Sequence, residues 1–244
     1  MNLEKNYVER FPARKSYSPK INGTEYIRKF IELNIGLFIC SIGMYLTVQA
    51  NCGLAPWIAL AVGFQNITGI NYGMWTNIIG IVIILADFLL KEKIGFATLG
   101  DALLIGSYVE IMNYFHILPV IDNTFIGILV MLLGIAIQDF GCFFYMDAGF
   151  GEGPRDALMV ALARRMKKLT VGQVRILLEG TVLVAGFLLG AKIGAGTVIF
   201  MVGAGAILDL EFFLLKFDVK RVLNEDMIDT VRNICSLSTA KNKA

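Results

Sequence analysis

Ionisable residues inside apolar stretches are the side chains of this sequence that could do chemistry. Asp139 has no opposite charge close to it in the sequence, whereas Arg175 and Glu179 lie one helical turn apart. Glu110 and Asp209 each follow a glycine by four residues. A charge at the centre of a membrane helix costs about 2.5–3.5 kcal/mol on insertion scales, so it needs a partner, a cavity or a neutral state. These five residues are therefore candidates for an ion or proton path.

Structural interpretations of the same residues stay open. Arg175 and Glu179 can neutralise each other as an ion pair. Asp139 can pair with Arg155 or Arg175, and it becomes a candidate proton carrier if it has neither partner.

Glu110 ends a predicted stripe on one helical face. The stripe continues through small residues that would let helices pack closely, which predicts that Glu110 faces protein. The alternative is a carboxylate near the outer interface that water can reach. The other members of the stripe are Thr98, Ala102 and Gly106.

A second candidate site is a Gly-x-x-Pro break that occurs twice, at 53–56 and at 151–154. Glycine permits a sharp reversal of the chain, and proline fits the first position of a helix. A helix of about 12 residues is predicted from each proline, which is too short to cross a bilayer. If its N-terminus points into the protein, such a half-helix favours an anion or a carboxylate. The predicted substrate-binding residues are Gly53, Pro56, Trp57, Gly151, Gly153, Pro154, Arg155 and Asp156.

The alternative for this motif is purely structural. Gly-x-x-Pro would then only connect two helices tightly, and Arg155 and Asp156 would be solvated at the cytoplasmic face. The two copies differ chemically, because Trp57 and Ile58 stand where the second copy has the charged pair. A site built from both would be asymmetric.

The break belongs to a longer internal match. A shift of 98 positions pairs Gly43 with Gly141 and Pro56 with Pro154, and a shift of 99 pairs Thr98 with Thr197. A chance match among apolar residues would not keep Gly, Pro, Lys and Thr in register over roughly 65 positions. The sequence therefore predicts a duplication.

Composition places the chain in a membrane. Apolar residues make up 56% of the sequence and charged residues 17%, and the mean hydropathy is +0.66. Soluble domains carry about 25% charged residues. A net charge of +2 does not suggest nucleic acid, and four cysteines without a Cys-x-x-Cys pair, with one histidine, do not suggest a metal site or a disulfide framework. No catalytic motif is found, so neither an enzyme nor a cofactor is expected.

Apolar stretches long enough to cross the bilayer occur six times. Lys and Arg gather in the first 29 residues, after the second stretch and after the fourth, which predicts that both termini are cytoplasmic. The predicted spans are residues 29–50, 73–90, 97–115, 124–146, 171–190 and 195–215.

The predicted fold is all-α: a polytopic membrane protein whose six transmembrane helices form an inverted 3+3 internal repeat, with two short half-helices after the Gly-x-x-Pro breaks. Three spans per copy are an odd number, so the second copy must enter the membrane in the opposite direction. The predicted units are a cytoplasmic tail (1–28), a first repeat (29–118), a second repeat (119–216) and a C-terminal cytoplasmic tail (217–244).

Two motifs carry a resemblance to a known family. The runs Gly151 to Met159 and Ile193 to Thr197, with weaker versions at Gly53 to Leu60 and Ile94 to Thr98, are similar to the YczE/YyaS/YitT-type bacterial membrane proteins. The resemblance covers approximately residues 30–215. It implies a multi-pass protein of the bacterial plasma membrane and brings no settled biochemical activity.

Two functions remain open from the sequence. Inverted repeats with broken helices are typical of secondary transporters, which predicts a permease for a small solute, with an anion as one option. The alternative is a membrane partner that regulates another protein without transport, because a fold does not dictate a function. The expected partners are the bilayer and a small solute, and the oligomeric state is open.

Overall fold

A computed structural model describes residues 23–241, without the side chains of 237–241. The predicted N-terminal tail lies mostly outside the described residues, but the first described helix begins at Gly23, six residues before the predicted span. All regular structure in the described part is helical. The helices, in chain order, are α2 (Gly23–Gln49), α3 (Pro56–Thr68), α4 (Tyr72–Leu89), α5 (Phe96–Gly100), η1 (Asp101–Ile105), α6 (Gly106–Tyr114), α7 (Thr124–Asp147), α8 (Pro154–Arg165), α9 (Val171–Leu188), α10 (Ala195–Leu214), η2 (Val219–Arg221) and α11 (Met227–Lys241).

Five of the described helices, α2, α4, α7, α9 and α10, are long and apolar enough to cross a membrane. Their bounds agree closely with five of the predicted spans. The other predicted span, 97–115, forms a run of three consecutive helical segments, α5, η1 and α6, in which η1 is a π-helix. Many large apolar side chains of the long helices are exposed, for example Phe88 on α4 and Leu188 on α9. Lipid is the solvent that suits such a surface.

Both short helices form as predicted. Pro56 and Pro154 occupy the first turn of α3 and α8, which have 13 and 12 residues. Gly69 ends α3 with a φ of 74°, a left-handed conformation that glycine adopts without a steric penalty.

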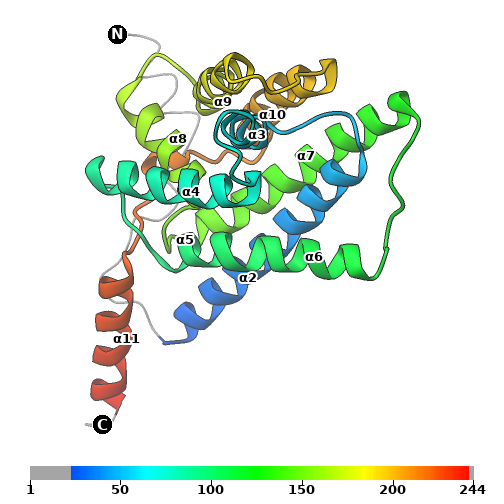
Figure 1. Cartoon of the computed structure of the whole chain (residues 1–244). Helices are drawn as coiled ribbons and strands as arrows, with labels where there is room; N and C mark the ends of the chain where they lie inside the picture. The colour runs from blue at the N-terminus through cyan, green and yellow to red at the C-terminus, as the bar shows by residue number, and fades with distance from the viewer. Residues whose placement is uncertain (1–22, 242–244) are drawn as a thin grey trace.

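The closest helix pair is α2 with α7, which run side by side in Figure 1. Glycines make this approach possible, because a Cβ on Gly43 would lie 2.5 Å from the Gly134 carbonyl oxygen. A Cβ on Gly141 would likewise lie 2.7 Å from the Gly36 carbonyl oxygen. Small residues that bring two backbones together are a standard way to pack membrane helices.

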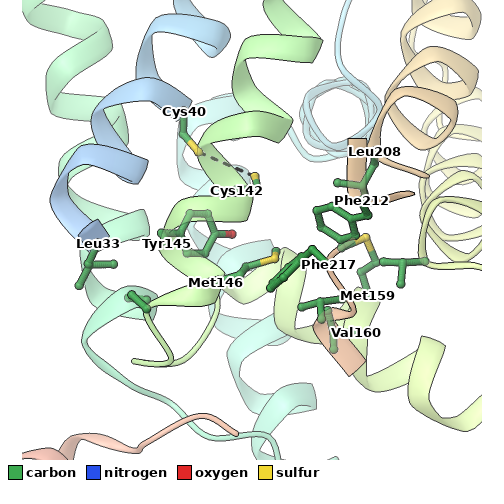
Figure 2. Close-up of a cluster of buried hydrophobic side chains, with 14 of the residues drawn as sticks. Leu33, Cys40, Cys142, Tyr145, Met146, Met159, Val160, Leu208, Phe212 and Phe217 are labelled. Atoms are coloured by element: carbon green, nitrogen blue, oxygen red, sulfur yellow. Dashed lines mark hydrogen bonds between the residues drawn. The ribbon is translucent and has the colours of Figure 1, made fainter. Parts of the chain in front are cut away.

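The main apolar core lies beside the contact between α2 and α7. Figure 2 shows Tyr145 and Met146 of α7 next to the Cys40–Cys142 contact, with Phe212 and Phe217 packed nearby. A smaller cluster, centred on Trp57, Ile83 and Val182, joins α3, α4, α8 and α9. These two clusters fix α3 and α8 inside the bundle.

The sequence predicts a C-terminal tail, but the first part of this region packs against the bundle. Phe217 and Val219 are buried, and the backbone N–H of Glu225 donates to the Gly149 carbonyl at 2.8 Å. Tyr26 donates its hydroxyl to the Glu225 carboxylate at 3.0 Å. Beyond this contact, α11 projects away from the bundle (Figure 1). Residues 217–230 therefore belong to the folded body.

Candidate functional site

The first turns of α3 and α8 come together at one place, which we call the half-helix junction (Pro56, Trp57, Pro154, Arg155 and Asp156). Trp57 and Arg155 hold the same position in the two copies of the break, and the Arg155 guanidinium carbon lies 5.5 Å from the centre of the Trp57 ring. This is a cation–π contact. Neither helix has a side-chain cap at its N-terminus, so backbone N–H groups and one arginine are presented together.

The two short helices leave the junction toward opposite ends of the bundle. Asn66, near the end of α3, donates to the carbonyl of Gly190 in the turn between α9 and α10 at 2.9 Å. Arg165, at the end of α8, donates to the carbonyl of Leu90 after α4, also at 2.9 Å. Their N-termini therefore face each other, as a shared binding site requires.

Arg155 and Asp156 have different surroundings. Arg155 is exposed, whereas Asp156 is half-buried and accepts a hydrogen bond from the Tyr145 hydroxyl. The Cys142 thiol lies 3.9 Å from the same Asp156 oxygen. The alternative in which both charges are simply solvated at a membrane face does not fit Asp156, which is held against α7.

Position 153 has space only for glycine, because the side chain of Asp101 lies close to it. A Cβ at this position would lie 2.6 Å from the carboxyl carbon of Asp101 on η1. Asp101 thus sits directly against the start of α8, where its charge acts on Arg155. No pattern in the sequence links Asp101 to this motif, because only the tertiary structure brings η1 to α8.

Gly53 and Gly151 serve packing between the two halves of the chain. A Cβ on Gly53 would lie 2.8 Å from the Thr197 hydroxyl oxygen at the start of α10. A Cβ on Gly151 would lie 2.9 Å from the Gly95 nitrogen before α5. Their φ angles are 149° and 90°, which also favour glycine. Both glycines support the junction from outside it, and a direct part in binding stays a prediction.

Three buried charges form a second group, which we call the buried triad (Asp139, Arg175 and Glu179). Arg175 donates from Nη1 to Asp139 Oδ1 at 2.6 Å and from Nε to Glu179 Oε1 at 3.2 Å. Asp139 is 0% exposed and Glu179 is 6% exposed. The predicted Arg175–Glu179 pair is confirmed, and of the two partners considered for Asp139 the structure selects Arg175.

Glu110 does not face protein, so the predicted packing stripe is wrong. Glu110, Ala102 and Gly106 are exposed, and a Cβ on Gly106 would meet nothing within 4 Å. The cause is η1, because hydrogen bonds to the fifth residue change the angular step between successive side chains. Thr98, which precedes η1, is buried, and the stripe turns outward after it.

Asp209 caps a helix. It accepts hydrogen bonds from the Thr170 hydroxyl and, at 2.8 Å, from the Gly172 backbone N–H at the start of α9. A carboxylate at a helix N-terminus stabilises the helix through its free N–H groups. This contact gives Asp209 a structural role, and its predicted place in an ion path has no geometric support.

Glu152 is a buried residue that sequence analysis missed. It is 1% exposed, accepts from the Asn224 amide at 3.1 Å and lies 3.7 Å from Arg164. Burial raises the pKa of this carboxyl to about 8, partly offset by Arg164 and Asn224. The sequence contains a signal for this residue, because Glu152 is a charged residue at the position that Leu54 occupies in the first copy of the motif.

Asp87, near the end of α4, is another buried carboxylate. Asp87 is 2% exposed, because the end of α4 packs against α8. One of its oxygens, Oδ1, has no hydrogen-bond partner among the described residues.

A separate cavity of about 570 Å³ opens where α4 and α8 end beside the C-terminal segment. Its lining includes Lys91, Lys93, Arg164, Lys220 and Arg232 together with three acidic residues. Two of these cations are already paired, Lys93 with Asp229 at 2.9 Å and Arg164 with Glu92 at 2.5 Å. The half-helix junction is not part of this cavity.

The described residues form an all-helical, multi-pass membrane protein with two short helices that begin at proline. Residues 27–211 match the model of a family of unknown function, DUF6198, and the chain belongs to this family. No solved structure matches the chain.

Curated relatives give the same assignment. An uncharacterised protein of Haemophilus influenzae is 34% identical over 75% of this chain and 81% of its own length. The uncharacterised membrane protein YczE of Bacillus subtilis is 33% identical over 71% of this chain and 80% of its own. YyaS of the same organism is 25% identical over 74% and 90%. The predicted membership of a YczE/YyaS-type family is confirmed.

Proposed function

We propose that this chain is a plasma-membrane transporter or permease for a small solute that carries an anionic group, and that the half-helix junction binds the solute. The contact between Trp57 and Arg155 carries the proposal. It places two helix N-termini and one guanidinium group at a single point between the halves of the chain. Discontinuous helices that meet in this way form the substrate sites of inverted-repeat transporters.

The proposal includes six spans in an inverted 3+3 arrangement. The cluster around Trp57 supports it, since Leu60 of α3 and Leu158 of α8 match at a shift of 98 and both pack there. Ile83 of α4 and Val182 of α9 match at a shift of 99 and also meet in this cluster. Contacts between matched positions are expected close to a pseudo-twofold axis. The run α5–η1–α6 would be the sixth span.

Orientation follows from the basic residues. Lys91, Lys93 and Arg165 lie at the end of the bundle that also carries α11 and the start of α2, whereas Lys192 lies at the other end. The positive-inside rule makes the α11 end cytoplasmic, with both termini on that side.

A thermal-shift screen of the purified protein against phosphate, sulfate and small carboxylates tests the proposed function. A bound ligand at about 100 times its Kd stabilises the fold by about 2.7 kcal/mol. Loss of a charge-assisted hydrogen bond costs about 1.5–3 kcal/mol, so Arg155→Ala should weaken binding at least about tenfold. Lys192→Ala, which removes an exposed cation far from the junction, should bind like the wild type. Proteoliposomes that show no flux for any stabilising anion, with Arg155→Ala no different from wild type, would contradict the proposal.

A non-transporting role as a partner of another protein is the second candidate. One observation favours it: the apolar side chains Ile228, Val231 and Ile234 of α11 are 70%, 50% and 40% exposed on a helix that projects from the bundle. Replacement of Ile228, Val231 and Ile234 by serine would remove this apolar surface while leaving the buried part of the C-terminal segment in place. Loss of a co-purifying protein with intact solute binding would separate the two functions.

A further inference from the structure

The buried triad carries more negative than positive charge. Asp139 and Glu179 share the single guanidinium group of Arg175. Each carboxylate uses one oxygen for this pairing, and the other oxygen, Asp139 Oδ2 or Glu179 Oε2, is buried without a hydrogen-bond partner among the described residues. Ionised carboxylates accept through both oxygens, so two unpartnered oxygens at one buried site are unusual.

The neighbouring groups do not neutralise the surplus negative charge of the buried triad. The positive charge of Arg155 on α8 interacts electrostatically with Glu179. The negative charge of Asp156 on the same helix interacts with all three members of the triad. Glu211 on α10 interacts electrostatically with Asp139 and Arg175, and its Oε2 is also buried without a hydrogen-bond partner among the described residues. The thiols of Cys40 on α2 and Cys142 on α7 lie within the field of Asp139 and are neutral donors at best. Asp101 adds another carboxyl beside Arg155.

A buried site with surplus negative charge must take up a cation or neutralise one carboxylate. A metal ion needs several oxygens that converge, and no group of three or more His, Cys, Asp or Glu residues in the described part of the chain has that geometry. A proton needs only one oxygen. Transfer from hydronium to one carboxylate gives a neutral carboxylic acid and water, and it turns one unpartnered oxygen into a hydrogen-bond donor.

We propose that Asp139 and Glu179 together bind one exchangeable proton, which is the coupling ion of the transport cycle. This inference rests on the proposed function for its coupling role, while proton binding itself does not depend on it. Arg155 links the two sites, since it lies in the half-helix junction and its charge interacts with that of Glu179. An anion that neutralises Arg155 removes that influence and increases the affinity of the pair for the proton. Solute and proton therefore bind together, as in symport.

Infrared difference spectroscopy of the purified full-length protein, titrated from about pH 5 to about pH 9 without any solute, tests proton binding. The wild type should show the C=O stretch of a protonated carboxyl group that disappears as the pH rises. Glu152→Gln should keep this band, although the Glu152 carboxyl titrates in the same range and adds a C=O stretch of its own. Asp139→Asn and Glu179→Gln should each abolish or shift this band. Glu110→Gln, which changes an exposed carboxylate, is the matched control and should leave the band unchanged.

Isotope labelling makes the test independent of whether a variant folds. Wild-type protein grown with carboxyl-labelled aspartate or carboxyl-labelled glutamate has an unchanged structure, and the band should move to lower frequency with one label or the other. No band at any pH, a band lost only in Glu211→Gln or Asp156→Asn, or a band set by sodium concentration instead of pH would each overturn the proposal. Since no solute is present, failure here leaves the proposed transport standing, and absence of flux leaves proton binding standing.

Discussion

Arg155 and Trp57 occupy the same position in two copies of one motif, yet they differ in charge, and their contact makes the half-helix junction asymmetric. A guanidinium group presents five donors in a planar fork, which suits a carboxylate or phosphate. The indole ring holds that group by its face and contributes an apolar wall. At this scale the chemistry depends on single side chains, and the space around them depends on glycines.

Gly153→Ala tests the closest of these approaches. The added Cβ would lie 2.6 Å from the Asp101 carboxyl carbon, so Asp101 or α8 must move. We expect a loss of about 1–3 kcal/mol in the free energy of unfolding, as for other overpacked sites. Gly106→Ala is the matched control, since its Cβ would meet nothing within 4 Å and should leave stability unchanged or raise it. Equal melting temperatures for the two variants would refute the contact.

Glu152 should make stability depend on pH. Its folded-state pKa of about 8 lies above the ordinary value of 4.5, so the folded state binds the proton more tightly than the unfolded state. Stability is therefore highest near and below about pH 4.5, falls by about 1.4 kcal/mol for each pH unit as the pH rises, and levels off above about pH 8. Glu152→Gln should flatten this part of the profile and melt at a higher temperature than wild type above pH 8.

Chemical unfolding of both proteins at a series of pH values measures the effect. The informative quantity is the difference between the two profiles, because other titrating groups contribute equally to both. Parallel profiles over this range would show that Glu152 is ionised in the folded protein.

At the scale of elements, the C-terminal segment is the part that differs most from its prediction as a tail. It contributes Phe217 and Val219 to the core and places Glu225 and Thr230 in buried positions. Asn224 of this segment also supplies the amide that contacts Glu152. The segment therefore closes the α11 end of the bundle as part of the fold.

Truncation at two points tests this role. Removal of residues 217–244 should cost several kcal/mol, because burial of one large apolar side chain is worth about 1.5–3 kcal/mol and several are lost. Removal of residues 237–244 should change the free energy of unfolding by no more than about 0.5 kcal/mol. If the long truncation melts like the full chain, the segment contributes nothing to the fold.

Glycine contacts between α2 and α7 give a second prediction for an element. Gly43→Ala should separate the two helices, since its Cβ would lie 2.5 Å from the Gly134 carbonyl oxygen. Gly80→Ala on α4, where a Cβ would meet nothing within 4 Å, is the control. We expect a lower melting temperature for the first variant alone, measured in detergent by the fluorescence of a dye that binds exposed cysteines.

For the whole molecule, the proposed orientation makes a prediction about access. A single cysteine in place of Lys192 should react with a membrane-impermeant maleimide added outside intact cells, whereas one in place of Lys91 should react only after the membrane is opened. Both positions are exposed in the structure, so burial does not confuse the comparison. Labelling of both sites from the same side would contradict the proposed topology.

Sequence alone determined the local features of this protein. Apolar length located the five long helices, and Gly-x-x-Pro located the start of both short helices, because these signals act within a few residues of the chain. The Arg175–Glu179 pair is local in the same sense, being one turn apart.

Tertiary structure decided the features that depend on distant partners. It selected Arg175 for Asp139, brought Asp101 against Gly153 and buried Glu152 under Asn224. It also turned Glu110 outward through η1, which no apolar pattern marks. A charge or a stripe of small residues shows only that a partner is needed, and which partner it meets depends on the surfaces that long-range packing brings together.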